Sequence, residues 1–231
     1  MNTTRSIVKW SDYFDQIYCV HYLPYKDRLL MVTNELEKVG ILNSGIFRFK
    51  YTYHTKFDTY VRQNIRSSDP SFSSGPRMNL CISLTLAYYR MFKESLALKY
   101  SHIAMLEDDV VFTDDIQTIA STLSNMPCGW DYIHFDKMLN KGFAHLLNQG
   151  VQVNDYFNTY SGGYWGTAFT AFSSKAMSCF CDIIEQELLI TDHVLENHNA
   201  DRVSDLNRFV PSTFVCYQRF KYDYYTKLYI C

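Results

Sequence analysis

Hydrophobic and polar positions are grouped along the chain in blocks that predict strands and helices in turn. The apolar run at 14–23 predicts a strand that stops at Pro24. Apolar residues spaced three and four apart over 29–39 then predict an amphipathic helix that ends at Gly40. The stretch 41–53 has an extended pattern. The first quarter of the chain is therefore expected to form strand, helix and strand.

The rest of the chain repeats this alternation. After a polar stretch at 54–75, which is typical of a long loop, a helix is expected to begin at Pro76 and to lead into a short buried strand at 102–106. Thr113 is the predicted N-cap of a helix over 114–126. Further strands are predicted at 130–136, 167–172 and 212–218, and further helices from 173 or 174 to about 188 and over 191–199.

Strands that alternate with helices favour an α/β fold. We expect one domain over 1–231, built as a mainly parallel central sheet flanked by helices in a Rossmann-like arrangement. In such sheets, ligands bind beyond the carboxyl ends of the strands. Residues that follow a strand are therefore the first candidates for a functional site.

Composition excludes several classes of protein. Hydrophobic residues make up 47% and charged residues 20% of the 231 positions, which is typical of a chain with a packed core. The net charge of -2 and the absence of a Lys/Arg cluster argue against nucleic acid as the main partner. No apolar run is long enough for a signal peptide or a transmembrane segment, so a cytoplasmic location is expected. The seven cysteines lack the spacing of a zinc site.

Three consecutive acids interrupt the apolar segment SHIAMLEDDVVF. Glu107, Asp108 and Asp109 follow a predicted strand, and Asp114 and Asp115 follow within six residues. One interpretation is a solvated acidic turn without a function. The other is a site for a hard divalent cation, because oxygen ligands bind such ions and relieve the repulsion between carboxylates. Mg²⁺ or Mn²⁺ held by one or two carboxylates typically completes its coordination with substrate phosphates.

Several stretches, in order, resemble glycosyltransferase family 25, the lipooligosaccharide and collagen galactosyltransferase type, which has a GT-A fold. They are IYCVHYLPYKDR, the segment NLCISLTLAYYRMFKESLALKYSHIAMLEDDV, GWDYIHFD, WGTAFTAFSSKAM, TDHVL and FVPSTFVCYQ. The block LEDDV is the most specific of these. The resemblance implies an inverting transfer of a sugar from a nucleotide diphosphate donor, such as UDP-galactose or UDP-glucose, to a hydroxyl of a glycan or protein acceptor.

The resemblance also implies roles for individual residues. Glu107 and Asp109 would hold Mn²⁺ or Mg²⁺, with His198 as a further ligand. In an extended segment, alternate side chains point to the same side, so Asp108 would face away from this pair and support the donor site. His21 and Arg28 would bind the nucleotide, although an Arg in the first turn of a helix is also explained by simple solvation.

The late segment supplies the expected catalytic base. Asp192 is the first candidate for accepting the proton of the acceptor hydroxyl, and an acid at a helix N-terminus is the structural alternative. His193 and His198 are further candidates for the base or for a ligand, or are surface histidines. Trp165 and Gly166 lie in a Gly-rich aromatic loop that is suited to a sugar ring, or form an ordinary turn.

Two other functions remain as alternatives. A noncatalytic binding or assembly protein could retain the glycosyltransferase scaffold and use its Tyr-rich tail, KYDYYTKLYIC, as a contact surface. A nucleotidyltransferase would also place Mg²⁺ on acids after a strand, but it usually has a Gly-rich phosphate loop near the first strand. The segment CVHYLPYKDR contains no glycine. The stretch 54–75 is also expected to close over the donor as a lid.

Overall fold

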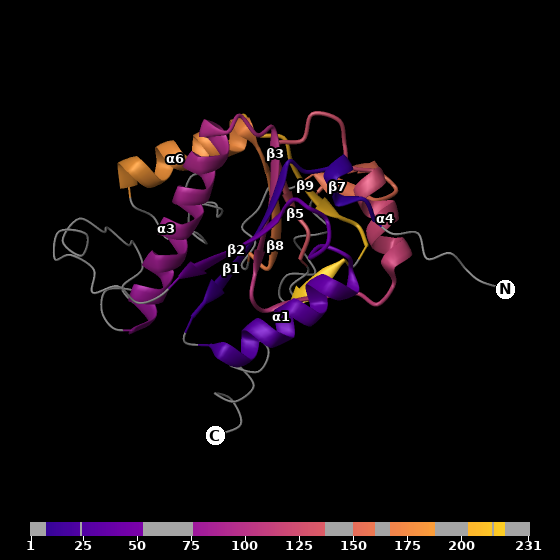
Figure 1. Cartoon of the computed structure of the whole chain (residues 1–231). Helices are drawn as coiled ribbons and strands as arrows, with labels where there is room; N and C mark the ends of the chain where they lie inside the picture. Colours follow the sequence, from indigo (N-terminus) through magenta and orange to yellow (C-terminus); the bar gives the residue numbers. More distant parts are fainter. Residues whose placement is uncertain are drawn as a thin grey trace, which may run out of the picture.

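A computed structural model describes residues 8–23, 25–52, 76–136, 150–159, 167–187, 203–213 and 215–219, with the backbone alone for 76–82 and 187. In this part of the chain, an eight-stranded sheet lies between two layers of helices (Figure 1). The α/β class expected from the alternation of strands and helices is confirmed.

The main sheet has the strand order β2-β1-β3-β8-β5-β9-β7-β6. Its strands are β1 (Gln16–Tyr22), β2 (Phe47–Thr52), β3 (His102–Glu107), β5 (Tyr132–His134), β6 (Gln152–Asn154), β7 (Phe157–Thr159), β8 (Phe169–Ser173) and β9 (Arg208–Pro211). A second sheet pairs β4 (Val110–Phe112) with β10 (Cys216–Gln218) in antiparallel fashion. Strands β4, β6, β7 and β9 were not expected, because three or four residues are too few to show a periodic pattern.

The main sheet is mixed, which corrects the expectation of a mainly parallel one. β1 is parallel to β2 and β3, and β5 is parallel to β9. β8 lies between β3 and β5 and is antiparallel to both, and β7 is antiparallel to β6 and β9. The period of apolar residues determines which face of a strand is buried but not its direction, so the sequence could not reveal this arrangement.

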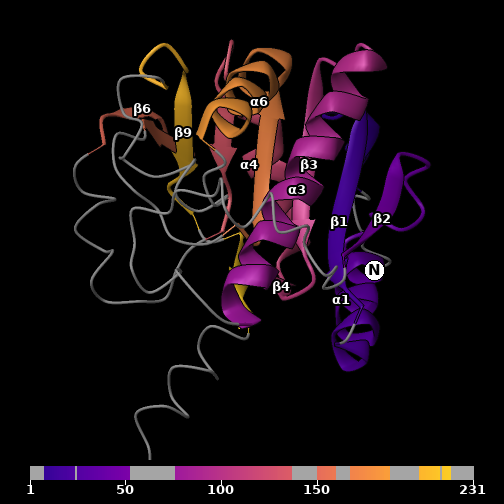
Figure 2. The ribbon, with the colours of Figure 1, turned by 90° about the vertical axis from the view of Figure 1, so that its left-hand side faces the viewer.

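Two pairs of helices cover the two faces of the sheet. On one face, α1 (Lys26–Lys38) and α4 (Ile116–Ser124) pack their apolar residues against β1, β3, β4 and β8. On the other face, α3 (Pro76–Ala97) and α6 (Ser174–Glu187) cover the strands, as Figure 2 shows. A short 3-10 helix, η1 (Trp10–Asp12), places the Trp10 ring in the hydrophobic core between the sheet and the pair α1 and α4.

Local signals explain most of the boundaries. All seven residues of β1 are buried, which fits its mostly apolar sequence between β2 and β3 in a sheet that helices cover on both faces. α3 begins at Pro76, as expected for a residue that fits the first helical turn. The helix expected after Thr113 instead begins at Ile116, because the Asp115 carboxylate accepts hydrogen bonds from the amides of Gln117 and Thr118 and is therefore the N-cap.

Some predicted elements lie outside the described residues. These are the loop at 54–75 and the short helix at 191–199, so the proposed lid stays a prediction. Among the described helices, none has both the length and the apolar character required to cross a membrane.

Candidate functional site at the carboxyl edge of the sheet

The acids lie at the edge where several strands end. β1 and β3 are parallel, and β5 runs in the same direction because β8 is antiparallel to both β3 and β5. The carboxyl ends of β1, β3 and β5 therefore meet at one edge, together with the start of β8. We call this the carboxyl edge.

Asp108 is bonded to both β1 and α1. Its Oδ2 atom lies 2.8 Å from Nδ1 of His21 and accepts a hydrogen bond of 3.1 Å from the amide of Tyr22. Its Oδ1 atom accepts a hydrogen bond of 3.1 Å from Nη1 of Arg28. The expected nucleotide-binding residues His21, Arg28 and Asp108 are thus brought together, and the Arg28 guanidinium offsets the charge of the carboxylate.

The adjacent aromatic residues hold Arg28 in place. The Arg28 guanidinium lies 4.5 Å from the centre of the Tyr25 ring, and Tyr22 contacts the same ring edge-on. Arg28 belongs to the first turn of α1, directly after the loop that leaves β1. Its side chain is 26% exposed, so the positive charge of this cluster reaches the surface at the carboxyl edge.

Glu107 has a different environment. The Thr167 hydroxyl donates to its Oε1 atom, and Nε2 of Gln218 donates to its Oε2 atom over 3.1 Å. Thr167 comes directly before β8 and Gln218 ends β10, so two separate segments orient this side chain. Both donors are neutral, so these two bonds fix the direction of the carboxylate without neutralising its charge.

Asp108 and Asp109 form a turn between β3 and β4, not the extended segment from which their directions were inferred. Their contacts nevertheless differ. The Asp108 side chain contacts β1 and α1, whereas the main-chain oxygen of Asp109 accepts a 2.9 Å bond from the amide of Arg219, next to β10. The side chain of Glu107 and the main chain of Asp109 thus both contact the segment at the end of β10, and Asp109 is buried.

Two buried thiols are affected by the negative charge of this edge. Burial raises the pKa of Cys19 well above its usual value, and the charges of Asp108, Glu107 and Asp109 add to this shift. Burial likewise raises the pKa of Cys216, with contributions from Asp136 and Asp109. Both cysteines are thus kept as neutral thiols.

Asp136 is a fourth acid near this edge, and we did not expect it from the sequence. It follows β5, forms an isolated bridge with Cys216, and accepts a hydrogen bond from the amide of Ala168. The signal was present in WDYIHFD, where polar groups at 132, 134 and 136 alternate with apolar ones in a buried strand. Thr167 and Gln218 were missed as well, because neither has a distinctive sequence context.

The other predicted site residues lie outside the described residues. These are the base candidates Asp192 and His193, the proposed ligand His198, and the loop residues Trp165 and Gly166. Within the described ranges, no group of three or more His, Cys, Asp or Glu residues is placed to hold a metal ion. A metal at Glu107 and Asp109 would therefore need its remaining ligands from elsewhere.

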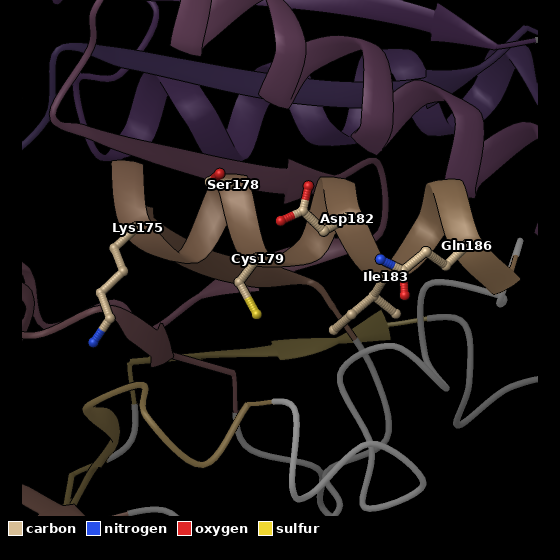
Figure 3. A pocket seen from close by; sticks show the side chains of 6 residues that line it. All are labelled: Lys175, Ser178, Cys179, Asp182, Ile183 and Gln186. Atoms are coloured by element: carbon tan, nitrogen blue, oxygen red, sulfur yellow. The ribbon is translucent and has the colours of Figure 1, made fainter.

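A hollow of about 610 Å³ lies along α6 (Figure 3). It is lined by Lys175, Ser178, Cys179, Asp182, Ile183 and Gln186. None of these was predicted as a site residue. Lys175 is bonded to Asp131, which precedes β5 and so lies at the opposite end of that strand from Asp136.

Comparisons with known proteins give distant structural similarity only. Neither a protein-family model nor a curated protein matches the sequence. A glycosyltransferase involved in glycosylation of the major capsid of PBCV-1 is 10% identical, with 92% of this chain and 99% of that one covered and a TM-score of 0.37. The galactosyltransferase LgtC is 13% identical, with 80% and 69% covered and a TM-score of 0.38.

The structure of A197 from STIV is similar at the same level, with 13% identity, 88% and 85% covered and a TM-score of 0.41. These values are too low to assign a family or a function. The α/β class follows from the strand order and the helical layers of this chain.

Proposed function

We propose that the protein is a metal-dependent inverting glycosyltransferase that moves a sugar from a nucleotide diphosphate donor, such as UDP-galactose or UDP-glucose, to a hydroxyl of a glycan or protein. The observation that carries the proposal is the position of Glu107 and Asp109. Glu107 ends β3 and Asp109 lies in the turn that follows, at the carboxyl edge, and the contacts of Glu107 with Thr167 and Gln218 orient its carboxylate. This is where ligands bind in α/β sheets.

The donor atoms fit Mn²⁺ or Mg²⁺. These ions prefer oxygen ligands, and Mg²⁺ typically uses only one or two carboxylates together with water and substrate phosphates. A pair of acids is therefore sufficient, and His198 remains a proposed further ligand. When bound, the ion would neutralise the charge that grows on the leaving nucleotide diphosphate.

The cluster of His21, Asp108 and Arg28 would hold the nucleotide. Asp108 fixes the position of the Arg28 side chain through a 3.1 Å bond, and the partly exposed guanidinium supplies positive charge beside the acids. A planar, always charged group of this kind binds phosphate oxygens well. Asp108 would thus act on the donor indirectly, by positioning Arg28.

The remaining roles belong to segments outside the described residues. We propose Asp192 as the base that accepts the proton of the attacking hydroxyl. Trp165 would contact the apolar face of a sugar ring, and Gly166 would allow close approach of the backbone. The acceptor is a glycan or a protein side-chain hydroxyl.

Mn²⁺-dependent hydrolysis of a panel of nucleotide sugars tests this function. Glycosyltransferases often hydrolyse their donors slowly without an acceptor, so one donor should be consumed in the presence of Mn²⁺ and spared with EDTA. The variant Asp109→Asn should lose this activity. Asp114→Asn is the matched control, because the Asp114 side chain is 99% exposed and lies after β4. A chain that consumes no donor and gains no thermal stability from UDP with Mn²⁺ would be a noncatalytic binding protein.

A further inference from the structure

A chain of buried polar side chains runs along β5 toward the carboxyl edge. The Tyr132 hydroxyl lies 3.0 Å from Nδ1 of His134, and Nε2 of His134 contacts Oδ1 of Asp136. All three side chains point to the same face of the strand, as residues two apart do. All three are buried.

This chain leads to Glu107 through two residues at the start of β8. Oδ2 of Asp136 accepts a 3.2 Å hydrogen bond from the amide of Ala168. The carbonyl oxygen of Ala168 accepts a 3.0 Å bond from the amide of Glu107, and the hydroxyl of Thr167 donates to the Glu107 carboxylate. The Thr167 carbonyl in turn lies 3.4 Å from the hydroxyl of Tyr88, on α3.

Burial determines what Asp136 can do. Its side chain is 0% exposed, so it cannot contact a donor or an acceptor directly. A buried carboxylate is costly without partners, so the hydrogen bond from the Ala168 amide to Oδ2 and the contact of Oδ1 with His134 both restrict where Asp136 can lie. Besides its main-chain bridge with Cys216, Asp136 contacts His134 on β5 and the amide of Ala168, whose carbonyl oxygen is bonded to the amide of Glu107.

We propose that Asp136, held by His134 and Tyr132, is a positioning residue that fixes residues 167 and 168 so that Thr167 orients the carboxylate of Glu107. The inference rests on the proposed function for the role of Glu107 as a metal ligand. The coupling between Asp136 and Glu107 is a property of the protein without ligands, so it can be tested whether or not Glu107 binds a metal.

The same two strands provide a matched control. Asp131 lies at the other end of β5, is also buried, and accepts hydrogen bonds from the Ser173 hydroxyl at the end of β8 and from the amide of Asn207. Each aspartate thus ties β5 to β8, but only Asp136 does so beside Glu107. Asp131→Ala and Asp136→Ala each remove a tie between β5 and β8 at opposite ends, and Asp131→Ala also removes an ion pair with Lys175.

Amide hydrogen exchange in the metal-free protein is the first test. In Asp136→Ala, the amides of Ala168 and Glu107 should exchange at least about 10-fold faster than in the wild type, because the acceptor that holds Ala168 is lost. In Asp131→Ala, the amide of Asn207 should change instead. An unchanged Glu107 amide in Asp136→Ala, or equal acceleration of all core amides, would overturn the inference.

Milder variants keep the test decisive if Asp136→Ala does not fold. Tyr132→Phe removes only the hydroxyl and should accelerate the same two amides to a smaller extent. Asp136→Asn keeps an oxygen acceptor for the Ala168 amide, so it should restore slow exchange. If the Glu107 amide exchanges fast in Asp136→Asn and no faster than in the wild type in Tyr132→Phe, the network does not position the end of β3.

Mn²⁺ affinity in the presence of UDP is the second test, measured by electron paramagnetic resonance. Residues that orient metal ligands typically contribute on the order of 10- to 100-fold to affinity, so Asp136→Ala and Thr167→Ala should each weaken binding by this factor. The variant with both Asp136→Ala and Thr167→Ala should bind Mn²⁺ no more weakly than Asp136→Ala alone, because both changes act through the contact between Thr167 and Glu107. Asp131→Ala should bind as the wild type does, and additive losses would contradict the proposed route.

The two tests separate two kinds of failure. A wild-type protein that binds no Mn²⁺ with UDP refutes the proposed function, and the exchange rates alone then decide whether Asp136 positions Glu107. A wild-type protein that binds Mn²⁺, with Asp136→Ala binding equally well, refutes the positioning role and leaves the proposed function intact.

Discussion

Glu107 and Asp108 are neighbours in the chain, but their carboxylates have different partners in the fold. Asp108 accepts hydrogen bonds from the Tyr22 amide and from the Arg28 guanidinium, and it faces the ring of His21. Glu107 accepts bonds from a hydroxyl and an amide side chain. The first carboxylate has a cationic partner in Arg28, whereas the second is oriented by the neutral groups of Thr167 and Gln218.

Neighbouring acids of one run thus have separate partners in the fold. Asp108 connects β3 to β1 and α1, so its removal should affect folding. Glu107 is oriented by Thr167 and Gln218, so its removal should affect binding. The two acids can therefore be separated by measuring stability and ligand binding on the same variants.

The largest effect on stability is expected for Asp108→Ala. This change leaves the buried His21 ring and the Arg28 guanidinium without their shared acceptor, and breaking such a partly buried pair typically costs about 3 kcal/mol. Urea unfolding of the metal-free protein measures this loss. A change below about 1 kcal/mol would show that the cluster does not hold β1, β3 and α1 together.

Arg28→Ala should have an intermediate effect. It removes one hydrogen bond to a charged group and the contact with the Tyr25 ring, which together are worth about 1.5–2 kcal/mol. UDP binding should weaken in the same variant if Arg28 meets the nucleotide. Lys26→Ala, at an exposed position in the same turn of the helix, is the control for a general loss of positive charge.

The buried thiol of Cys19 gives a smaller, pH-dependent effect. Because its pKa is raised in the folded protein, the unfolded chain loses this proton first as the pH rises, so stability falls above the usual thiol pKa. At pH of about 9.3 this loss is about 0.7 kcal/mol. Urea unfolding of Cys19→Ala should decline less steeply with pH between 8 and 9.3 than that of the wild type, and parallel curves would contradict a neutral buried thiol.

The smallest effect on the metal-free protein is expected for Glu107→Gln. The side chain keeps its size and one oxygen acceptor, so the free energy of unfolding should change by about 0.5 kcal/mol. With Mn²⁺ and UDP at 100 times the dissociation constant, the wild type should gain about 2.7 kcal/mol and the variant nothing. A large loss of metal-free stability would place Glu107 in the same class as Asp108.

The sequence was sufficient to predict the layers and the place of the acids at the end of a buried strand. Continuous apolar runs at β1 and β3, the start of α3 at Pro76, and the acids after β3 were all legible as local patterns. Such features depend on residues close together in the chain, where periodicity and helix signals apply.

The partners of the acids were not predictable in the same way. Thr167 and Gln218 reach Glu107 across 60 and 111 positions of the sequence, and the reversed direction of β8 brings Thr167 to this edge. Asp136 likewise depends on β5 and β8 being neighbours. Contacts of this kind follow from strand order, which a single sequence does not encode locally.

Diffraction from crystals soaked in Mn²⁺ and UDP tests the central claim most directly, because manganese has an anomalous signal that locates it without a model of the ligand. The account predicts a peak bound by the carboxylates of Glu107 and Asp109, with the UDP phosphates completing the coordination. An empty carboxyl edge, with Glu107 still bonded to Thr167 and Gln218 and no metal beside it, would contradict the proposed sugar transfer.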